Sequence, residues 1–284
     1  MSEVGEAVAR LAGAGVVDER PLGSVTRCEL DDGSSVVVKR AEPSAIAAEA
    51  AGLRWLRDGA TDPGLRVPAV RGTDEQWLVS EAVPEGAASA DTAAAFGRGL
   101  SAMHAAGAPA FGSPPPGGPV HAWIGNARMV DETGADWPAW YAEHRVLPYV
   151  RQAREQGTFS ADDVAVFERA CARLPAVAGP DEPPARLHGD LWTGNVLWGD
   201  DAAWILDPAA HGGHRETDLA MLALFGCPRL ETVLAAYDEA APLAEGRRDR
   251  VAVHQLFPLL VHTVLFGGAY AGQARRAAAS VPGA

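Results

Sequence analysis

The stretch that most constrains this chain is LHGDLWTGNVLW, residues 187–198, which is followed closely by ILDPA at residues 205–209. It places His188, Asp190 and Asn195 close together, with glycines between them. Two interpretations are open. Gly, Asp and Asn are ordinary turn residues, so the stretch could be a surface loop between two strands. Alternatively, it is a catalytic loop in which a carboxylate and an amide converge on a phosphate group and a metal ion.

The spacing within this stretch favours the catalytic loop. Asn195 follows Asp190 by five residues, and Asp207 lies on the next predicted strand. In kinase catalytic loops, written H-R-D-L-x-x-x-N, the Asp accepts the proton of the acceptor hydroxyl and the Asn binds Mg²⁺. An Asp at the end of the following strand bridges Mg²⁺ to the phosphates. We therefore predict Asp190 as the catalytic base, and Asn195 and Asp207 as oxygen ligands of Mg²⁺.

The N-terminal half contains a matching pair of charged residues. Lys39 ends the strand-like run SSVVVKR, and Glu49 lies on the helix predicted just after it. Kinases use this order for an ion pair that directs the lysine onto the α- and β-phosphates of ATP. Lys39 is also the only lysine among the 24 Lys and Arg residues of the chain. Because an arginine fork does not replace a compact ammonium, we predict a phosphate-binding role, against chance survival in an arginine-biased chain.

The first part of the chain is predicted to be rich in strands. Two strand-prone runs, 25–30 and 34–40, flank an Asp-Gly turn and predict a β-hairpin. A helix over 44–60 follows, with Ser44 as its predicted N-cap. Two further strands are predicted at 67–73 and 76–83.

The rest of the chain is predicted to be mainly helical. The elements expected there are helices at 91–104, 135–157 and 160–174, a Pro/Gly-rich loop at 107–119, two short strands around the turn at 199–201, and helices to the C-terminus. We therefore predict an α+β, bilobal, protein-kinase-like fold. Residues 1–83 would form a small, β-rich nucleotide-binding lobe, and residues 84–284 a larger α-helical lobe for catalysis and substrate binding.

Composition excludes several other classes of protein. The net charge is −13 and no long basic run occurs, so a nucleic-acid partner is not expected. Three widely spaced cysteines without a C-x-x-C motif support neither a disulfide scaffold nor a thiolate zinc site. The apolar run 256–272 contains Pro258 and His262 and predicts a buried core helix rather than a membrane span. With no signal-peptide pattern at its start, the chain is expected to be cytoplasmic.

On the basis of these motifs, the sequence resembles the fructosamine kinase (ketosamine kinase) family, within the aminoglycoside-phosphotransferase and protein-kinase-like superfamily. The likeness lies in LHGDLWTGNVLW, WILDPAAHGGHRETDLAMLALFG and HQLFPLLVHTVLFGGAYAG, and more faintly in WIGNARMVDETGADWPAWYAEHRVLP. Trp192 and the GHRETDLAM block distinguish the chain from aminoglycoside and choline kinases. The resemblance implies transfer of phosphate from ATP, with Mg²⁺, to the sugar 3-hydroxyl of a free or protein-bound ketosamine.

The resemblance also implies roles for further residues. Glu81 and Val83 would form the hinge that offers backbone groups to adenine, Trp192 and His262 would lie near the sugar, and Asp218 would brace the catalytic loop. One departure is that the phosphate-covering segment RPLGSVTR has a single glycine, so Ser24 or backbone amides alone would cover the phosphates.

Other interpretations stay open at this point. The chain could phosphorylate another hydroxylated amine, such as an aminoglycoside or a choline-like compound, or be a non-catalytic, kinase-like binding module. Trp192 and His262 could be core residues. Cys28 could be a reactive thiol, although an inert small residue is favoured. The segment HGGHRE offers two histidines and a glutamate, but it lacks a third nitrogen or sulfur ligand, which favours a packed loop over a zinc site.

Overall fold

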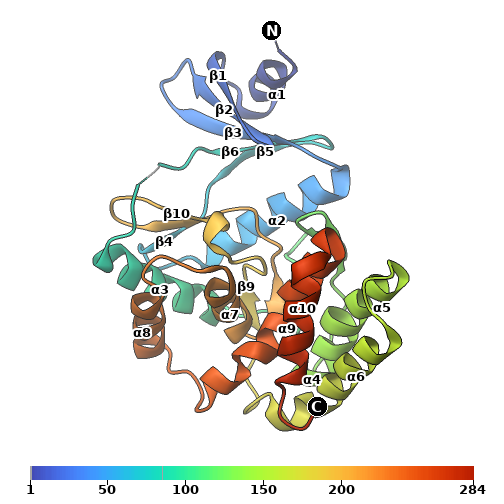
Figure 1. Ribbon diagram of the computed structural model, residues 1–284. Helices are drawn as coiled ribbons and strands as arrows, with labels where there is room; N and C mark the ends of the chain where they lie inside the picture. The colour runs from blue at the N-terminus through green and yellow to red at the C-terminus, as the bar shows by residue number, and fades with distance from the viewer. Residues whose placement is uncertain (1, 85) are drawn as a thin grey trace.

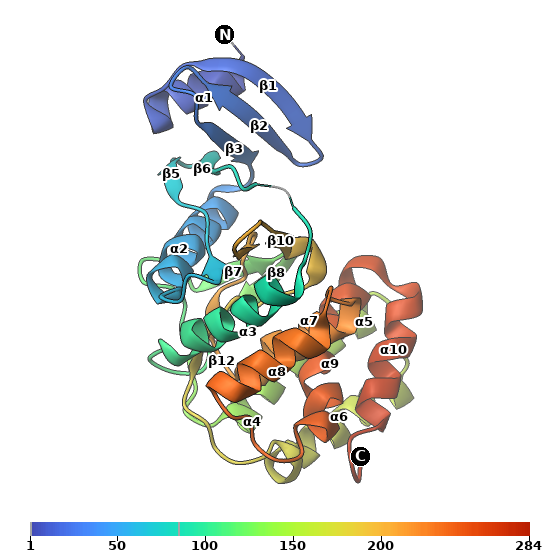
Figure 2. The ribbon, with the colours of Figure 1, turned by 90° about the vertical axis from the view of Figure 1, so that its left-hand side faces the viewer.

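The computed structural model describes residues 2–84 and 86–284. It places an antiparallel sheet with one helix at the N-terminal end, above a larger part that is mainly helical (Figure 1). A view turned by 90° separates the sheet and α1 from the helices below (Figure 2). The α+β class predicted from the sequence is confirmed.

Five strands form the N-terminal sheet in the order β1-β2-β3-β6-β5, and all neighbouring pairs are antiparallel. Their bounds are β1 Val16–Leu22, β2 Val25–Leu30, β3 Ser35–Arg40, β5 Val70–Thr73 and β6 Trp77–Glu81. The predicted hairpin is confirmed as β2 and β3, and the two further strands as β5 and β6. Strand β1 and the helix before it were not predicted.

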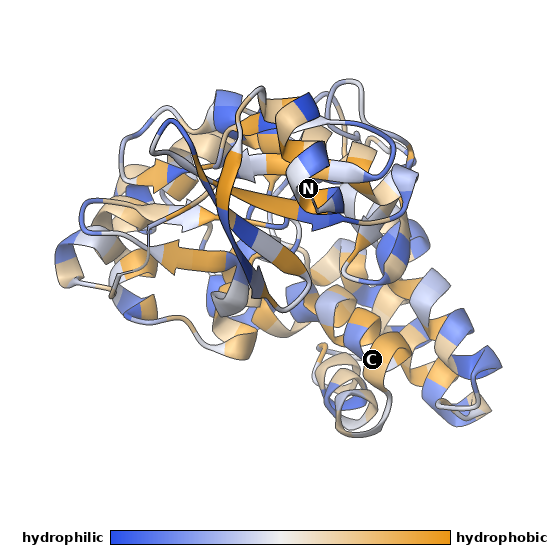
Figure 3. Ribbon diagram, turned by 90° about the horizontal axis from the view of Figure 1, so that it is seen from above, coloured by the Kyte–Doolittle hydropathy of each residue, from blue (hydrophilic) through white to orange (hydrophobic). Residues whose placement is uncertain are grey.

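The alternation of side chains along the strands gives this sheet two different faces. On one face, Cys28 and Val38 are buried against the first helix, α1 (Glu3–Ala12). On the other face, Val37 and Lys39 line a cavity beneath the sheet. Seen from above and coloured by hydropathy, the strands carry orange hydrophobic stretches between polar ones (Figure 3). The sheet therefore covers α1 with one face and forms the roof of a site with the other.

Helix α2 (Pro43–Gly59) follows β3 and lies beneath the sheet (Figure 2). The prediction that Ser44 caps this helix is wrong. Pro43, whose fixed φ suits the first helical position, starts the helix one residue earlier, and Glu42 is the N-cap residue. The Ser44 hydroxyl instead donates to Glu42 at 3.2 Å and accepts a hydrogen bond from Trp123 Nε1 at 3.0 Å.

Helices dominate the remainder of the chain. They are α3 Ala90–Ala105, α4 Trp137–Trp140, the π-helix η1 Tyr141–Val146, α5 Leu147–Glu155, α6 Ala161–Val177, the 3₁₀ turn η2 Thr193–Asn195, α7 Glu216–Phe225, α8 Leu230–Ala240, α9 Arg247–Phe266 and α10 Gly268–Ala279. Their buried apolar side chains form two large clusters, one around α5, α6 and α9 and one shared by α2, α3 and α8. These clusters hold the loops between the helices in fixed positions.

Two helix predictions need correction. Residues 135–157 form α4, η1 and α5 rather than one helix, because Pro148 has no N–H to donate and the widened π turn before it accommodates this. The same turn aims Arg145 at the buried Asp131, with a nitrogen–oxygen distance of 2.7 Å.

The run 256–272 is split between α9 and α10, because Gly267 has a φ of 60°. In the described part of the chain, no helix has the length and apolarity needed to cross a membrane.

Short strands arrange the loops of the helical part. They are β4 Leu65–Arg66, β7 His121–Ile124, β8 Ala127–Val130, β9 Ala185–Leu187, β10 Val196–Trp198, β11 Ala203–Ile205 and β12 His211–Gly213. Strands β10 and β11 are the predicted pair around residues 199–201, whereas the hairpin β7–β8 was not predicted. Strand β4 pairs in parallel with β11, so a segment that precedes β5 is joined to the strands that follow the predicted catalytic loop. The division at residues 83 and 84 stays a prediction.

Candidate active site

The segment from His188 to Asn195 forms a tight loop between β9 and β10. Gly189 has a φ of 82°, and a Cβ atom there would lie 2.1 Å from the carbonyl oxygen of Ala209. Only glycine suits this position, because other residues rarely adopt that conformation and no space exists for a side chain. The His188 Nε2–H donates to the Leu206 carbonyl at 2.8 Å, which ties the loop to the end of β11.

Asp218, on α7, anchors this loop from below. Its carboxylate accepts the backbone N–H of His188 at 2.7 Å and that of Gly189 at 2.9 Å. His104 on α3 donates to the same carboxylate at 3.1 Å and accepts from the Tyr237 hydroxyl at 2.8 Å. Burial would raise the pKa of Asp218, but the His104 hydrogen bond helps to hold it below its ordinary value. Sequence reasoning did not find His104, which is one histidine in an apolar helix.

The loop presents Asp190 beside Asn195. The Asn195 side-chain amide donates to the Asp190 backbone carbonyl at 2.9 Å and to its carboxylate at 3.2 Å. Burial raises the pKa of the Asp190 carboxyl to about 7, against the lowering effect of the Asn195 hydrogen bond, and the nearby charge of Asp207 adds to the rise. A carboxylate with increased proton affinity is suited to accept a proton near neutral pH.

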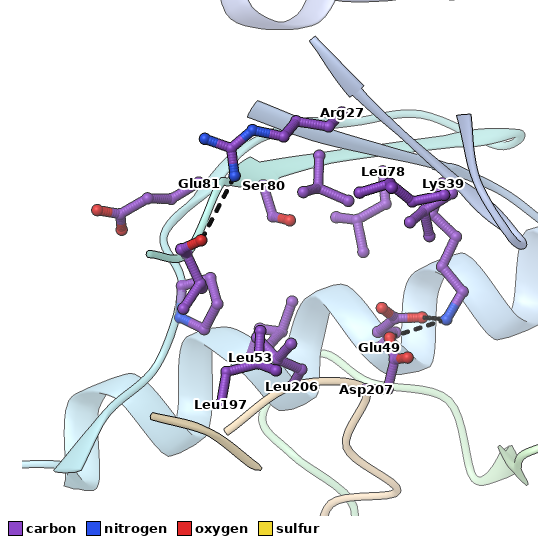
Figure 4. Close-up of a pocket in the computed structure, with 15 residues that line it drawn as sticks. Arg27, Lys39, Glu49, Leu53, Leu78, Ser80, Glu81, Leu197, Leu206 and Asp207 are labelled. Carbon is purple, nitrogen blue, oxygen red and sulfur yellow. Dashed lines mark hydrogen bonds and ion pairs between the residues drawn. The ribbon is translucent and has the colours of Figure 1, made fainter. Parts of the chain in front are cut away.

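Three predicted residues meet under the sheet, although they come from β3, α2 and the segment after β11. Lys39 Nζ lies 2.7 Å from Glu49 Oε2 and 3.0 Å from Asp207 Oδ1, as Figure 4 shows. Asp207 has a φ of 49°, an unusual conformation for a residue with a side chain, and its side chain is 52% exposed. Such strain is typical of functional positions.

Charge and burial act in opposite directions on this trio. Burial would lower the pKa of Lys39, but the carboxylates of Glu49 and Asp207 outweigh it and raise that pKa. Burial likewise opposes ionisation of Asp207, yet the Lys39 charge keeps the Asp207 pKa below its ordinary value. Glu49 is the most buried member, and burial raises its pKa. The ammonium is therefore firmly charged and shared between two carboxyl groups.

A cavity lies between the sheet and the strands of the catalytic region (Figure 4). Apolar side chains from both sides line most of it: Leu22, Val25, Val37, Leu53, Pro68, Leu78, Leu197 and Leu206. Glu49, Lys39 and Asp207 lie at one end and Glu81 at the other (Figure 4), and Val83 also lines the cavity. A flat apolar ring with a phosphate chain matches this division into an apolar middle and a charged end.

The two predicted hinge residues differ in their free backbone groups. The Glu81 N–H already donates to the Ala69 carbonyl at 2.9 Å, whereas no described residue accepts a hydrogen bond from the Val83 N–H. The Val83 carbonyl accepts from Arg27 at 3.5 Å. Arg27, on β2, was not predicted, because nothing in the sequence distinguishes it from the many other arginines.

A second cleft continues from the charged end of this cavity. It is lined by residues from both parts of the molecule, among them Ser24, Lys39, Trp123, Asn126, Asp190, Trp192, Asn195 and Asp207. The predicted phosphate-covering loop is a two-residue turn, Gly23 and Ser24, between the paired Leu22 and Val25. Trp123 and Asn126, from the hairpin β7–β8, were missed because that hairpin was not predicted.

Of the two residues predicted to lie near the sugar, Trp192 lines this cleft and His262 lies behind it. Trp192 lines it directly and is 38% exposed. Its indole lies over Gly194, where a Cβ atom would come within 2.3 Å of the ring. His262 does not contact the cleft itself but packs on Phe225 at 4.6 Å between ring centres, and Phe225 meets the edge of Trp192 at 6.1 Å.

The segment HGGHRE is a packed loop, as the sequence favoured. Glu216 forms a buried ion pair with Arg250 at 2.6 Å, and the His211 Nδ1–H donates to the Ala209 carbonyl at 2.8 Å. Burial lowers the pKa of His214 to about 4. Within residues 2–84 and 86–284, no group of three or more His, Cys, Asp or Glu side chains is placed to hold a metal ion.

Known proteins are similar to this chain over most of its length. The family model described as fructosamine kinase matches residues 25–281. A probable ketoamine kinase of Thermus thermophilus is 33% identical over 247 residues, covering 85% of each chain. The chloroplastic protein-ribulosamine 3-kinase of Arabidopsis thaliana is 30% identical, over 82% of this chain and 70% of that protein.

Solved structures are similar over nearly the whole chain. The crystal structure of a candidate fructosamine-3-kinase from Thermobifida fusca has 45% sequence identity and a TM-score of 0.91, covering 98% of both chains. A choline kinase of Streptococcus pneumoniae has 15% identity and a TM-score of 0.62, covering 97% of this chain and 96% of its own, and shows the shared fold alone. The predicted kinase-like arrangement is therefore confirmed.

Proposed function

The chain belongs to the fructosamine kinase family, and we propose that it transfers the γ-phosphoryl group of ATP to a sugar hydroxyl of a ketosamine. The observation that carries this proposal is the convergence of Lys39, Asp207 and Asp190 on one cleft, next to an apolar cavity. The names of the relatives, ketoamine kinase and ribulosamine 3-kinase, support a ketosamine substrate and, for the second, the 3-hydroxyl.

In this proposal the apolar cavity binds adenine. The ring lies between Val37 in the roof and Leu197 and Leu206 in the floor, which provide apolar contact on both faces. The Val83 N–H donates to a ring nitrogen, and a hinge carbonyl, that of Glu81, accepts from the exocyclic amine. The triphosphate then points toward Lys39, which replaces part of its contact with Asp207 by contact with phosphate oxygens.

The residues present suit a magnesium ion. The Asn195 amide nitrogen is engaged by Asp190, which leaves its side-chain oxygen as a ligand, and the half-exposed Asp207 carboxylate faces the same cleft. Both are hard oxygen donors, and Mg²⁺ is commonly held by one or two carboxylates with substrate phosphates and water. When bound, Mg²⁺ supplies neutralisation of phosphate charge. We propose Asn195 and Asp207 as its protein ligands.

Asp190 performs the proton transfer in this scheme. As the sugar hydroxyl attacks the γ-phosphorus, its O–H bond breaks and the proton passes to the Asp190 carboxylate. A new oxygen–phosphorus bond forms while the bond from the γ-phosphorus to the bridging oxygen of ADP breaks, so ADP and the phosphorylated ketosamine are the products. Asn195 keeps the carboxylate pointing into the cleft, and Asp218 holds the loop that carries it.

We further propose the division of labour that the sequence suggested: residues 1–83 as a nucleotide-binding lobe and residues 84–284 as the lobe for catalysis and substrate binding. The alternative acceptor, an aminoglycoside or choline-like compound, has support from the fold alone, because those relatives share less than a fifth of their residues with this chain. A non-catalytic module is disfavoured, since every charged group that phosphoryl transfer needs lies in the cleft.

A substrate screen tests the proposal. ADP release would be followed by a coupled assay with ATP, Mg²⁺ and, in turn, fructosyl-lysine, ribulosyl-lysine, an aminoglycoside and choline. We expect turnover with a ketosamine and none with the other two, and ³¹P NMR should locate the phosphate on the 3-hydroxyl. Turnover confined to the aminoglycoside or choline would overturn the ketosamine assignment. Asp190→Asn serves as the control for contaminating kinases.

A further inference from the structure

A continuous group of aromatic rings leads away from the catalytic loop. The rings are Trp192, Phe225, His262, Phe266 and Tyr270, and we call them the aromatic shelf. The centre-to-centre distances are 4.9 Å from His262 to Tyr270, 5.6 Å from His262 to Phe266 and 6.0 Å from Phe266 to Tyr270. The shelf thus extends in contact from a residue of the acceptor cleft to the junction of α9 and α10.

The shelf is open to solvent at its outer end. Phe266 is 66% exposed, the second-highest value among the exposed large hydrophobic residues, and Trp192 is 38% exposed. The junction of α9 and α10 lies on the side of the helical part that faces the N-terminal sheet (Figure 1). Consecutive positive φ angles at Gly267 and Gly268 turn the chain there, which brings Phe266 and Tyr270 beside each other. A large exposed apolar side chain that is joined through ring contacts to a residue of the cleft suggests a binding role.

The shelf rings also carry no positive charge of their own. In the described residues, six arginines lie over seven aromatic rings, and those rings are Trp55, Trp77, Trp123, Trp140, Trp204, Tyr237 and Phe257. None belongs to the shelf. His262 is neutral at neutral pH, because burial lowers its pKa, and its Nδ1–H donates to the Pro258 carbonyl at 2.8 Å. Among the described residues, no arginine therefore lies over Trp192 or Phe266, the two exposed members of the shelf, and a cation from outside can bind at these rings.

A ketosamine brings such a cation to this place. Its amine nitrogen is attached to C1 of the sugar, two carbons from the 3-hydroxyl, and a secondary alkyl amine is protonated at neutral pH. Trp192 lines the same cleft as Asp190, so we take the ammonium group and its substituent to leave the cleft past this ring when the 3-hydroxyl is at Asp190. The exit along the shelf offers ring faces to the ammonium and apolar contact to the alkyl chain.

We propose that the aromatic shelf is the subsite for the amine half of the substrate, binding a protonated secondary amine and the alkyl chain that it carries. This inference rests on the proposed function and specifies its substrate class. A ketosamine of an alkyl amine, such as the lysine side chain, fits the shelf. A ketosamine of an α-amino group places a carboxylate beside the nitrogen, against the electron-rich ring faces, and is a poorer substrate.

Substitution of Phe266 tests this subsite outside the catalytic loop. The substrates would be Nα-acetyl-Nε-fructosyl-lysine and fructosyl-glycine, each at saturating ATP. Phe266→Ala should raise the KM for the lysine substrate roughly two- to fivefold, the size expected of a partly exposed cation–π contact, with the KM for ATP unchanged. Phe266→Leu keeps the apolar volume without the ring and should resemble Phe266→Ala, whereas Phe266→Tyr should resemble the wild type.

A charge pair at the same position gives a second readout. Phe266→Lys should raise the KM for the lysine substrate further, and Phe266→Glu should lower it relative to Phe266→Ala, with both differences reduced by salt. Val120→Ala, a large exposed apolar residue outside the shelf, is the matched control and should change neither KM.

The outcomes distinguish failure of the proposed amine subsite from failure of the proposed ketosamine kinase activity. Wild-type protein that phosphorylates no ketosamine would refute both. An active enzyme whose KM for the lysine substrate is the same in Phe266→Lys, Phe266→Glu and wild type would refute the shelf alone, as would an equal or better kcat/KM for fructosyl-glycine.

Discussion

Replacing Lys39 by Arg is the sharpest test of the nucleotide end of the site. The swap keeps the positive charge but lengthens the side chain and replaces a point donor by a planar fork. Lys39 Nζ contacts Glu49 at 2.7 Å and Asp207 at 3.0 Å, so a longer side chain with a larger, planar head group cannot keep both contacts with the same geometry. The guanidinium must therefore push the phosphates, or Asp207, away from their positions.

The size of the effect follows from this displacement. A shift of about 1 Å in a reacting group can lower the rate on the order of 10²-fold. That corresponds to about 2.7 kcal/mol of transition-state stabilisation, at about 1.36 kcal/mol for each factor of ten. The melting temperature should barely change, because the buried carboxylate of Glu49 keeps a cationic partner.

The assay measures kcat, the KM for ATP and Tm on the same preparation. Arg10→Lys is the matched control, since it makes the reverse exchange in an exposed ion pair with Asp74 on the outer side of the sheet. Exposed pairs contribute ~1 kcal/mol or less, so this control should keep full activity. A Lys39→Arg enzyme with normal kcat would show that the lone lysine is an accident of composition, and the role given to Lys39 would be wrong.

Further predictions concern four single residues. Asp190→Asn should retain ATP binding in calorimetry but lose ~10²–10⁴-fold in kcat. Asp207→Asn should instead weaken the binding of Mg²⁺ and ATP. Full activity of the Asp190→Asn variant would exclude Asp190 as the base. Trp192→Ala should raise the KM for the ketosamine and leave the KM for ATP unchanged, and equal effects on both would mean that Trp192 only supports the loop. Cys28 should stay unmodified by iodoacetamide in mass spectrometry of the folded protein, because burial raises its pKa to about 11; rapid alkylation would contradict this.

The sequence predicts those parts of the site whose residues lie close together along the chain. Asp190 and Asn195 lie in one loop, so their spacing alone brings them within hydrogen-bonding distance. Lys39 and Glu49 lie on consecutive elements, a strand and the helix that follows it, and therefore meet whenever that helix packs under the sheet. Asp207 is the exception in distance along the chain, but it closely follows β11, the strand that pairs with β10 after the loop.

The parts that the sequence does not predict depend on packing between distant segments. Arg27 reaches the hinge because β2 lies beside β3, and Trp123 reaches the cleft because a short hairpin folds back onto α2. His104 is 114 residues from Asp218, and only the packing of α3 near α7 joins them. A single histidine or arginine has no periodicity or spacing from which such a contact could be inferred.

The partners of Lys39 illustrate a second limit. The order of residues along the chain points to Glu49 as the partner of Lys39 and to Asp207 only as a metal ligand, so it does not say that both carboxylates share the ammonium. Here Lys39 contacts both, and in the proposed complex the phosphates of ATP take over part of its contact with Asp207. Binding of the nucleotide must therefore exchange one anionic partner for another, while the more buried Glu49 stays in place. Which contact persists depends on burial, and burial is a property of the folded cleft rather than of any motif.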